Sequence, residues 1–457
     1  MALLESNARS SDSACDPAPV PQTLPAVSGS AAAAPSLMER FRGAFWTLFD
    51  QGAISLGSFL LNVGLARHLT GQEYGTFALL LGAFFMIQHF NASFIYYPLM
   101  MKLAGGKQGR PSDLVFTSLV LTALSVGVFS DLLTTWLIIF GRSDIAIAAG
   151  VYLVLWQLQD VMRRALLAQF SHRMAAIGDG IAYMGAAAGI GILVLFDRLT
   201  LSNALFTMAG SSALAIIVQV IQRPPTFPHA STLGDLLAGW ALGKWAFVNG
   251  VILIATMQVF PWMLVAMDGP AAAANFQSVL NIANLANPIT LGLSNIIMPA
   301  VAQAHATGSI RHAWRVASIY IIIGVTLLSF FVIPVMLMPE TVLVLLYGAN
   351  SPFANLSEAV NLMVLAVAFN AIADLMNQFI FGVGPGKSAL WMNGMSLGVV
   401  IVLLPFLGSE GVAACALVLA AAKVVRLVVA SCIVAQLVSS EDRPSRKHLD
   451  GCRGGGA

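Results

Sequence analysis

Charged residues are scarce in this sequence, and their scarcity excludes several classes of protein. Of 457 residues, 10% are Asp, Glu, Lys or Arg, whereas 58% are apolar and the mean hydropathy is +0.82. A soluble globular protein usually carries about 25% charged residues. The composition therefore excludes a disordered chain and a soluble enzyme with a polar surface. A net charge of +2, with no large basic domain, also argues against a nucleic-acid partner.

Signs of enzyme chemistry are missing as well. The four cysteines have no spacing typical of a disulfide framework or a metal site: Cys15, Cys415, Cys432 and Cys452. The segment 382–388 imitates a phosphate-binding loop, but Phe381 stands where that motif requires glycine. There is no Ser/His/Asp triad and no acid–base pair in a soluble domain. We therefore expect no enzyme, no catalytic residues, no metal and no bound cofactor.

Long apolar runs fill most of the chain. A membrane-spanning helix needs about 20 residues, and barrel strands would be shorter and alternating. Twelve runs have the length and hydropathy of spanning helices: 44–66, 76–101, 113–140, 145–168, 174–196, 200–221, 240–265, 271–300, 316–339, 357–383, 388–408 and 410–438. The sequence therefore predicts an all-α polytopic membrane protein with about twelve transmembrane helices.

The runs fall into two sets of six, separated by a polar, proline-bearing segment. This division predicts a disordered cytoplasmic tail over 1–43, a first lobe over 44–221 and a cytoplasmic linker over 222–239. A second lobe over 240–438 and a cytoplasmic tail over 439–457 complete the chain. Segments that alternate between the two sides divide the positive charges unequally: one side holds 17 Lys and Arg, the other only Arg67, Arg142 and Arg198. The positive-inside rule then predicts that both termini are cytoplasmic.

The two lobes carry short matching segments, which suggest a duplicated unit. Gln51-Gly52 and Gly71 in the first lobe correspond to Asn249-Gly250 and Gly269 in the second, at one offset of 198 residues. Asp160 and Asp374 also occupy matching runs. Because each lobe has an even number of spans, the implied pseudo-two-fold axis lies along the membrane normal. This arrangement is typical of alternating-access transporters.

Several segments then resemble a known family. The stretch 65–78 (LARHLTGQEYGTFA), the run-4 ending 160–167 (DVMRRALL), the Asn-rich segment 281–299 and Leu345-Leu346-Tyr347-Gly348 look like bacterial polysaccharide-export flippases. These belong to the multidrug/oligosaccharidyl-lipid/polysaccharide (MOP) exporter superfamily. The resemblance covers roughly residues 40–438.

The resemblance implies a MATE-like, two-lobe fold and a location in the bacterial inner membrane. It implies that the chain moves undecaprenyl-diphosphate-linked oligosaccharide across that membrane, for exopolysaccharide, capsule or O-antigen (lipopolysaccharide) biosynthesis. The partners so implied are the polyprenyl-diphosphate-linked oligosaccharide, membrane lipids and a polysaccharide polymerase complex. Coupling to H⁺ or Na⁺ would drive the cycle.

Two cations near the middle of the last run are the sharpest candidates for a binding site. Lys423 and Arg426 are three residues apart and so share one helical face. Charges inside a membrane usually face a cavity or a partner. An ammonium group and a guanidinium fork suit the oxygens of a lipid diphosphate. The alternative is internal pairing with a carboxylate such as Asp374 or Asp131, where Asp131 would mark a break in its run.

Three further cations are weaker candidates for the diphosphate. Lys244 lies one turn inside its run and either snorkels to the surface or faces the cavity. Arg163 and Arg164 end run 4 and either anchor that helix or meet the anionic headgroup. Among the carboxylates, Asp50, Asp160 and Asp374 are candidates for coupling H⁺ or Na⁺, or for internal ion pairs.

Amide side chains form a polar stripe on the eighth run. Asn281, Asn284 and Asn287 recur every third residue, and Pro288 invites a kink because it lacks a backbone amide donor. These amides either bond to neighbouring helices or contact sugar hydroxyls in the cavity.

Rival functions stay open at this point. An ion-coupled multidrug (MATE-type) antiporter would need a carboxylate-dominated cavity. A membrane-embedded glycosyltransferase would normally show large outer loops with catalytic groups, whereas the longest one here, near 340–356, holds no Lys, Arg or His. A scaffold of a polysaccharide assembly complex, without transport, is the third.

Overall fold

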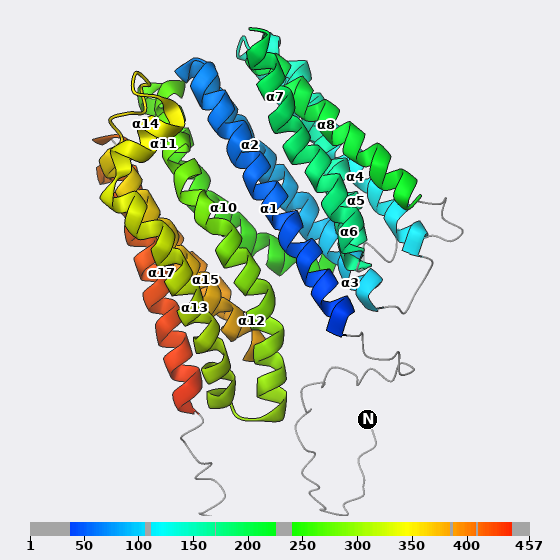
Figure 1. The fold of residues 1–457 in the computed structure, drawn as a ribbon, viewed down its shortest axis with the longest axis vertical. Helices are drawn as coiled ribbons and strands as arrows, with labels where there is room; N and C mark the ends of the chain where they lie inside the picture. Colours follow the sequence, from blue (N-terminus) through cyan, green and yellow to red (C-terminus); the bar gives the residue numbers. More distant parts are fainter. Residues whose placement is uncertain are drawn as a thin grey trace, which may run out of the picture. The chain divides into compact units, whose positions relative to one another are not determined.

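The fold consists of helices joined by short turns (Figure 1). The computed structural model describes residues 37–105, 111–169, 171–224, 240–383, 387–407 and 410–440, and this part of the chain contains no strand. Most of both predicted tails and of the predicted linker lies outside these residues. From Gly43 onward the chain forms one compact unit, separate from residues Met1–Arg42.

The described residues of the first half form eight α-helices and two short π-helical segments. These are α1 (Leu37–His68), α2 (Gly71–Asn91), η1 (Ala92–Tyr96), α3 (Tyr97–Gly105), α4 (Pro111–Ile139), α5 (Ser143–Ala168), α6 (His172–Asp179), η2 (Gly180–Met184), α7 (Gly185–Leu195) and α8 (Leu201–Gln222). A capping box starts α2: Glu73 donates its backbone amide to the Thr70 hydroxyl and accepts the Thr70 amide in return.

In the second half, the part of the chain that the structure describes forms eight α-helices and one 3₁₀ segment. These are α10 (Trp240–Asp268), α11 (Pro270–Ala283), η3 (Asn284–Ala286), α12 (Asn287–Thr307), α13 (Ile310–Leu337), α14 (Pro339–Tyr347), α15 (Ser357–Val383), α16 (Lys387–Leu407) and α17 (Val412–Ser440). The 3₁₀ break lies directly before Pro288, where the sequence predicts a kink. The break predicted at Asp131 is wrong, because α4 runs unbroken from Pro111 to Ile139.

All twelve apolar runs lie in helices, and within the described residues eleven spans are long and apolar enough to cross a membrane. The remaining run falls in α1, where Asp50, Gln51 and Asn62 interrupt the apolar sequence. The short helix α14, inside the predicted outer loop 340–356, was not foreseen from the sequence.

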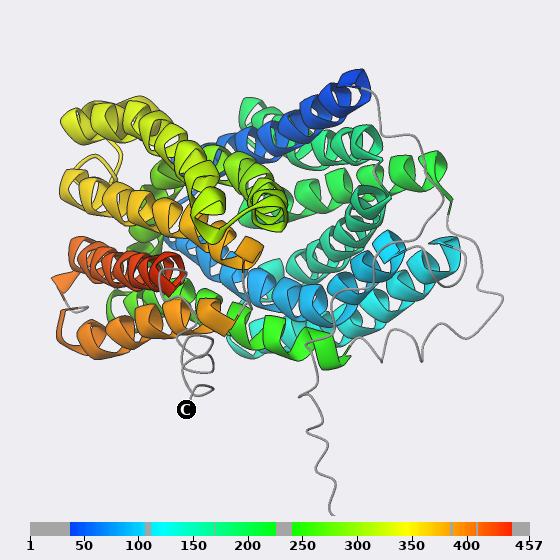
Figure 2. The same cartoon turned by 90° about the horizontal axis from the view of Figure 1, so that it is seen from below.

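Each half packs mainly within itself. In the first half α5 packs against α4 and α8, and in the second α15 packs against α12, α13 and α17. Seen from below, the helices from α13 onward gather on one side of the bundle (Figure 2). Contact between the halves is made chiefly by α2, which packs against α11 and α10.

The α2–α11 contact depends on small residues at the end where both helices begin, at the top of Figure 1. A side chain at Gly75 would overlap the backbone of Pro270, so only glycine allows this approach. A Cβ built on Gly71 would lie 3.6 Å from the Cβ of Ala271. One turn further in, the side-chain amide of Asn281 donates to the buried Tyr74 hydroxyl at 2.6 Å.

The α2–α10 contact depends on Gly250, the glycine of the second-half repeat segment Asn249-Gly250. A side chain at Gly250 would overlap the ring of His89 on α2. That ring stacks on Phe247, with 6.1 Å between ring centroids. The corresponding Gly52 of α1 has no neighbour within 4 Å of a built Cβ. This glycine therefore serves helix packing in the second half only.

Candidate functional site

The second half holds a buried polar cluster centred on Arg426, near the middle of α17. The guanidinium donates from Nε to Asn393 Oδ1 at 2.8 Å and from Nη1 to Asn370 Oδ1 at 2.8 Å. Its Nη2 forms an ion pair with Asp374 Oδ1 at 2.7 Å. Arg426 therefore joins α15, α16 and α17, and the pairing alternative drawn from the sequence describes its contacts, with Asp374 and not Asp131.

Amide groups extend this cluster on two sides. Asn370 Nδ2 donates to Asp374 Oδ2 at 2.8 Å, because residues four apart share a face of α15. Asn393 Nδ2 donates to Asn249 Oδ1 at 2.8 Å, which links α16 to α10. The side-chain amides thus fix the position of Arg426 through bonds to three other helices.

Within the ion pair of this cluster, the carboxylate is the more exposed partner. The Arg426 side chain is 3% exposed, whereas the side chain of Asp374 is 32% exposed. The accessible part of this ion pair is therefore Asp374.

Lys423, one turn before Arg426, is a buried cation of a different kind. It is 5% exposed and makes no hydrogen bond or ion pair with any residue that the structure describes. Burial of an ammonium ion is costly unless an anion compensates for the lost hydration. With Lys423, Arg426 and Asp374 ionised, this cluster carries one positive charge in excess.

The first half holds a second ionic cluster, centred on Arg163. Its guanidinium pairs with Asp50 of α1 at 3.1 Å, with Asp160 of α5 at 3.9 Å and with Asp179 of α6. Asp50 and Asp179 are almost fully buried. Gln159 Nε2 also donates to Asp179 Oδ1 at 2.8 Å. One arginine thus holds three helices together through their carboxylates.

Arg164 completes this first-half cluster. Its Nε pairs with Asp160 Oδ2 at 2.9 Å, and its guanidinium lies 5.1 Å from the ring centroid of Tyr96. Gln88 of α2 donates to the same Asp160 oxygen at 3.1 Å. Counted as ionised groups, the cluster has three carboxylates and two guanidinium groups, and so one negative charge in excess. Asp50 Oδ1 has no hydrogen-bond partner among the described residues.

The remaining sequence candidates, Lys244 and the three asparagines, lie outside the hydrogen bonds and ion pairs that define the two clusters. The Lys244 side chain is exposed on the second turn of α10. Asn281 is buried against Tyr74, between the two halves. Asn284 accepts a hydrogen bond from Asn287 at 3.2 Å beside the 3₁₀ break. The amide stripe therefore bonds locally and across the interface between the halves.

Sequence reasoning did not single out four members of the two clusters, namely Gln88, Gln159, Asn370 and Asn393. It named Asn249 only as part of the repeat and not as a member of a polar cluster. The spacing of Asn370 and Asp374 on one helical face was a usable signal. The partners on other helices had no signal in a single sequence, because the pairing of helices decides them.

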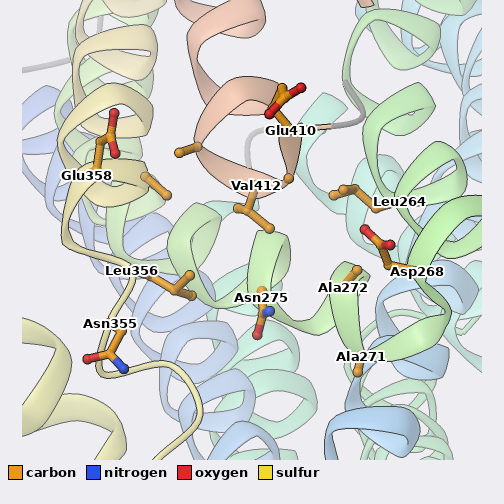
Figure 3. A pocket seen from close by; sticks show the side chains of 13 residues that line it. Leu264, Asp268, Ala271, Ala272, Asn275, Asn355, Leu356, Glu358, Glu410 and Val412 are labelled. Atoms are coloured by element: carbon orange, nitrogen blue, oxygen red, sulfur yellow. The ribbon is translucent and has the colours of Figure 1, made fainter. Parts of the chain in front are cut away.

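Among the cavities outside the clusters, two differ clearly in their lining. One of about 250 Å³ in the first half is lined by aromatic side chains, including Phe77, Phe85, Trp156 and Tyr183. The other, of about 460 Å³, opens at the end of the second half (Figure 3). Its carboxylates, Asp268, Glu358 and Glu410, each lie at or just before the first turn of a helix: α11, α15 and α17. Acidic groups stabilise helix N-termini, which accounts for their place there.

Comparison with known proteins identifies the fold. No family model and no curated protein sequence matches the chain. An inward-facing MATE-family multidrug resistance transporter of the MOP superfamily has a TM-score of 0.70 at 15% identity, covering 88% of this chain and 99% of its own. The lipid II flippase MurJ, in an inward closed conformation, has a TM-score of 0.63 at 13% identity and 87% coverage of both chains.

A MOP-superfamily transporter from Pyrococcus furiosus has a TM-score of 0.61 at 13% identity, covering 87% of this chain and 96% of its own. At these identities the likeness is one of fold. The chain is therefore a multi-pass membrane protein with the fold of MOP-superfamily transporters, which confirms the predicted all-α, two-lobe, MATE-like architecture.

Proposed function

We propose that this chain is a flippase that moves polyprenyl-diphosphate-linked oligosaccharide across the bacterial inner membrane by alternating access. The observation that carries the proposal is Lys423, a buried ammonium group that forms no hydrogen bond or ion pair with a described residue, in a cluster with one positive charge in excess. A phosphate-bearing cargo supplies the missing anion. The fold that this chain shares with a lipid II flippase supports a lipid-linked substrate.

The rest of the cycle follows from the two clusters. The glycan occupies polar space between the lobes, and the lipid tail stays in the bilayer. Asp50, Asp160 and Asp179 form a cluster with one negative charge in excess, which suits uptake of H⁺ or Na⁺ as the coupling ion. We place both termini in the cytoplasm on the strength of the charge distribution in the sequence. A polysaccharide polymerase complex is the partner that would receive the cargo.

Replacing Lys423 by glutamine tests the proposal. We expect the K423Q variant to reach the membrane normally and to lose at least about tenfold in transport rate, because one charge-assisted contact to the diphosphate disappears. Transport is measured as movement of labelled undecaprenyl-diphosphate-linked sugar across proteoliposomes.

Arg198→Gln is the matched control, since it removes an exposed positive charge from the α7–α8 turn. Lysine-to-arginine replacement at 423 should retain part of the activity. If K423Q transports the labelled lipid at the wild-type rate, the assignment of the diphosphate site to Lys423 is wrong.

A multidrug antiporter is the second candidate function, and the aromatic cavity of the first half favours it. Its side chains suit a flat organic cation, and MATE transporters share the fold. This function requires that expression in a pump-deficient host raise resistance to organic cations such as ethidium. The flippase proposal expects no such resistance and expects transport of the lipid-linked sugar.

A further inference from the structure

The contact between Asp374 and Arg426 has a consequence for how a diphosphate would bind and leave. We propose that Asp374 is an internal competitor: its carboxylate occupies the open side of Arg426 and is displaced by the diphosphate of the cargo. This inference rests on the proposed function and adds a step that regulates the same site.

The geometry suits such an exchange. A carboxylate oxygen 2.7 Å from Nη2 occupies a position that a phosphate oxygen can also take, because both are oxyanion acceptors for a guanidinium fork. The other two contacts of Arg426, to Asn393 and Asn370, do not involve Asp374. Arg426 therefore keeps its position when the carboxylate swings away.

Exposure gives the direction of the exchange. Asp374 is the partly exposed member of the pair and Arg426 the buried one. The carboxylate can therefore move toward the open side without disturbing the packing of α17. The amide Nδ2 of Asn370, which donates to Asp374, is then free to donate to the incoming phosphate.

Charge gives the reason for the exchange. Once Asp374 has moved, Lys423 and Arg426 together present two positive charges. The two linked phosphates of a lipid diphosphate sugar carry two negative charges. When the cargo leaves, the carboxylate returns and the cluster keeps one positive charge in excess instead of two. Because buried unpaired charges are costly, this return eases reorientation of the protein without cargo.

Replacing Asp374 by asparagine tests the competition directly. The probes are three compounds with the same lipid and sugar: farnesyl diphosphoglucose, farnesyl phosphoglucose and the uncharged farnesyl glucoside. Binding to the full chain in lipid nanodiscs is measured at equilibrium. We expect D374N to bind the diphosphate probe about tenfold more tightly, the monophosphate about threefold more tightly, and the glucoside unchanged, as Coulomb attraction scales with ligand charge. Transport by D374N should slow, because release of the cargo slows.

Two further variants separate charge from packing. The N370D/D374N exchange moves the carboxylate one turn, to a side chain that already contacts Arg426 at 2.8 Å. Because the net charge of the site is unchanged, we expect no tightening of the diphosphate probe relative to wild type, in contrast to D374N. If D374N does not fold, R426Q, which keeps the carboxylate, and R426Q/D374N, which removes both charges of the pair, show how the charge of Asp374 affects binding of the diphosphate probe when Arg426 is absent. We expect the double variant to bind the diphosphate probe more tightly than R426Q.

The outcomes distinguish the two proposals. If wild type binds the glucoside as tightly as the diphosphate probe, the proposed function fails. If wild type prefers the diphosphate and K423Q loses that preference, but D374N binds all three probes as wild type does, the competition alone is overturned. Equal tightening of the glucoside, or equal tightening by N370D/D374N, overturns it as well.

Discussion

A disulfide introduced between α2 and α11 by the substitutions Gly71→Cys and Ala271→Cys is expected to abolish transport, and its reduction is expected to restore transport. These two helices join the halves of the molecule. A Cβ built on Gly71 lies 3.6 Å from the Cβ of Ala271. Cβ atoms in disulfides are about 3.5–4.5 Å apart, so the bond should form without moving the backbone.

The reason for the loss is the motion that alternating access requires. If cargo leaves on the side where α2 and α11 begin, the halves must separate there. A covalent bond between positions 71 and 271, next to the close contact of Gly75 with Pro270, forbids that separation. The experiment uses a chain whose four native cysteines are replaced, and measures transport of labelled lipid-linked sugar before and after addition of dithiothreitol.

A matched control exists within the first half. A Cβ built on Gly185 lies 3.8 Å from the Cβ of Ser211, so G185C/S211C should form an equally easy disulfide between α7 and α8. We expect this bond to leave transport close to the level of the cysteine-free chain, because it joins two helices of one half. Full transport by the oxidised G71C/A271C variant would mean that the halves need not part at this end.

The helices could be predicted from the sequence because lipid imposes a simple rule. A backbone that crosses a bilayer must satisfy its own hydrogen bonds, so long apolar runs form helices whatever their neighbours are. The predicted run 357–383 and helix α15 have the same bounds. By contrast, α1 extends beyond its run, because helix formation at the membrane surface follows local propensity and capping rather than hydropathy.

The roles of Lys423 and Arg426 could not be separated by the same reasoning. Their spacing of three residues places both on one face, and that much is a property of any helix. Which of them finds a partner depends on where α15 and α16 pack. The structure gives Arg426 three hydrogen-bonding neighbours and leaves Lys423 with none among the described residues. A single sequence carries no signal for that difference.

The two halves, which carry the repeated segments, build their polar clusters from corresponding helices. Asp160 pairs with Arg164 in the first half, and Asp374 pairs with Arg426 in the second. The first helix of each half also contributes a polar side chain to its cluster, Asp50 in α1 and Asn249 in α10. The charges differ, however, since the first cluster has a negative excess and the second a positive one. The two halves therefore differ in the sign of their excess charge, a difference that the proposed coupling of a cation to an anionic cargo would use.

Replacing Arg163 by glutamine is expected to cause the largest loss of stability of any single substitution considered for this protein. Arg163 compensates Asp50 and Asp179, whose side chains are 1% and 0% exposed. Removing one partner of a buried ion pair costs about 3–5 kcal/mol, mainly because a charge is left buried without compensation. We therefore expect R163Q to show a markedly lower unfolding temperature in detergent and poor recovery from the membrane.

Neutralising the carboxylates that R163Q leaves without compensation, Asp50 and Asp179, should restore the stability that this variant loses. The triple variant D50N/R163Q/D179N has no buried carboxylate in excess at this place, and neutral replacement of a whole buried ion cluster is often tolerated. Its unfolding temperature should return close to the wild-type value, while the dependence of transport on the coupling ion should be lost. Asp144→Asn is the control, because it breaks the ion pair of this exposed carboxylate with Arg142 and leaves the hydrogen bond from Arg142 to Thr76 in place; it should cost less than about 1 kcal/mol. If R163Q were as stable as D144N, Arg163 would not be the group that holds α1, α5 and α6 together.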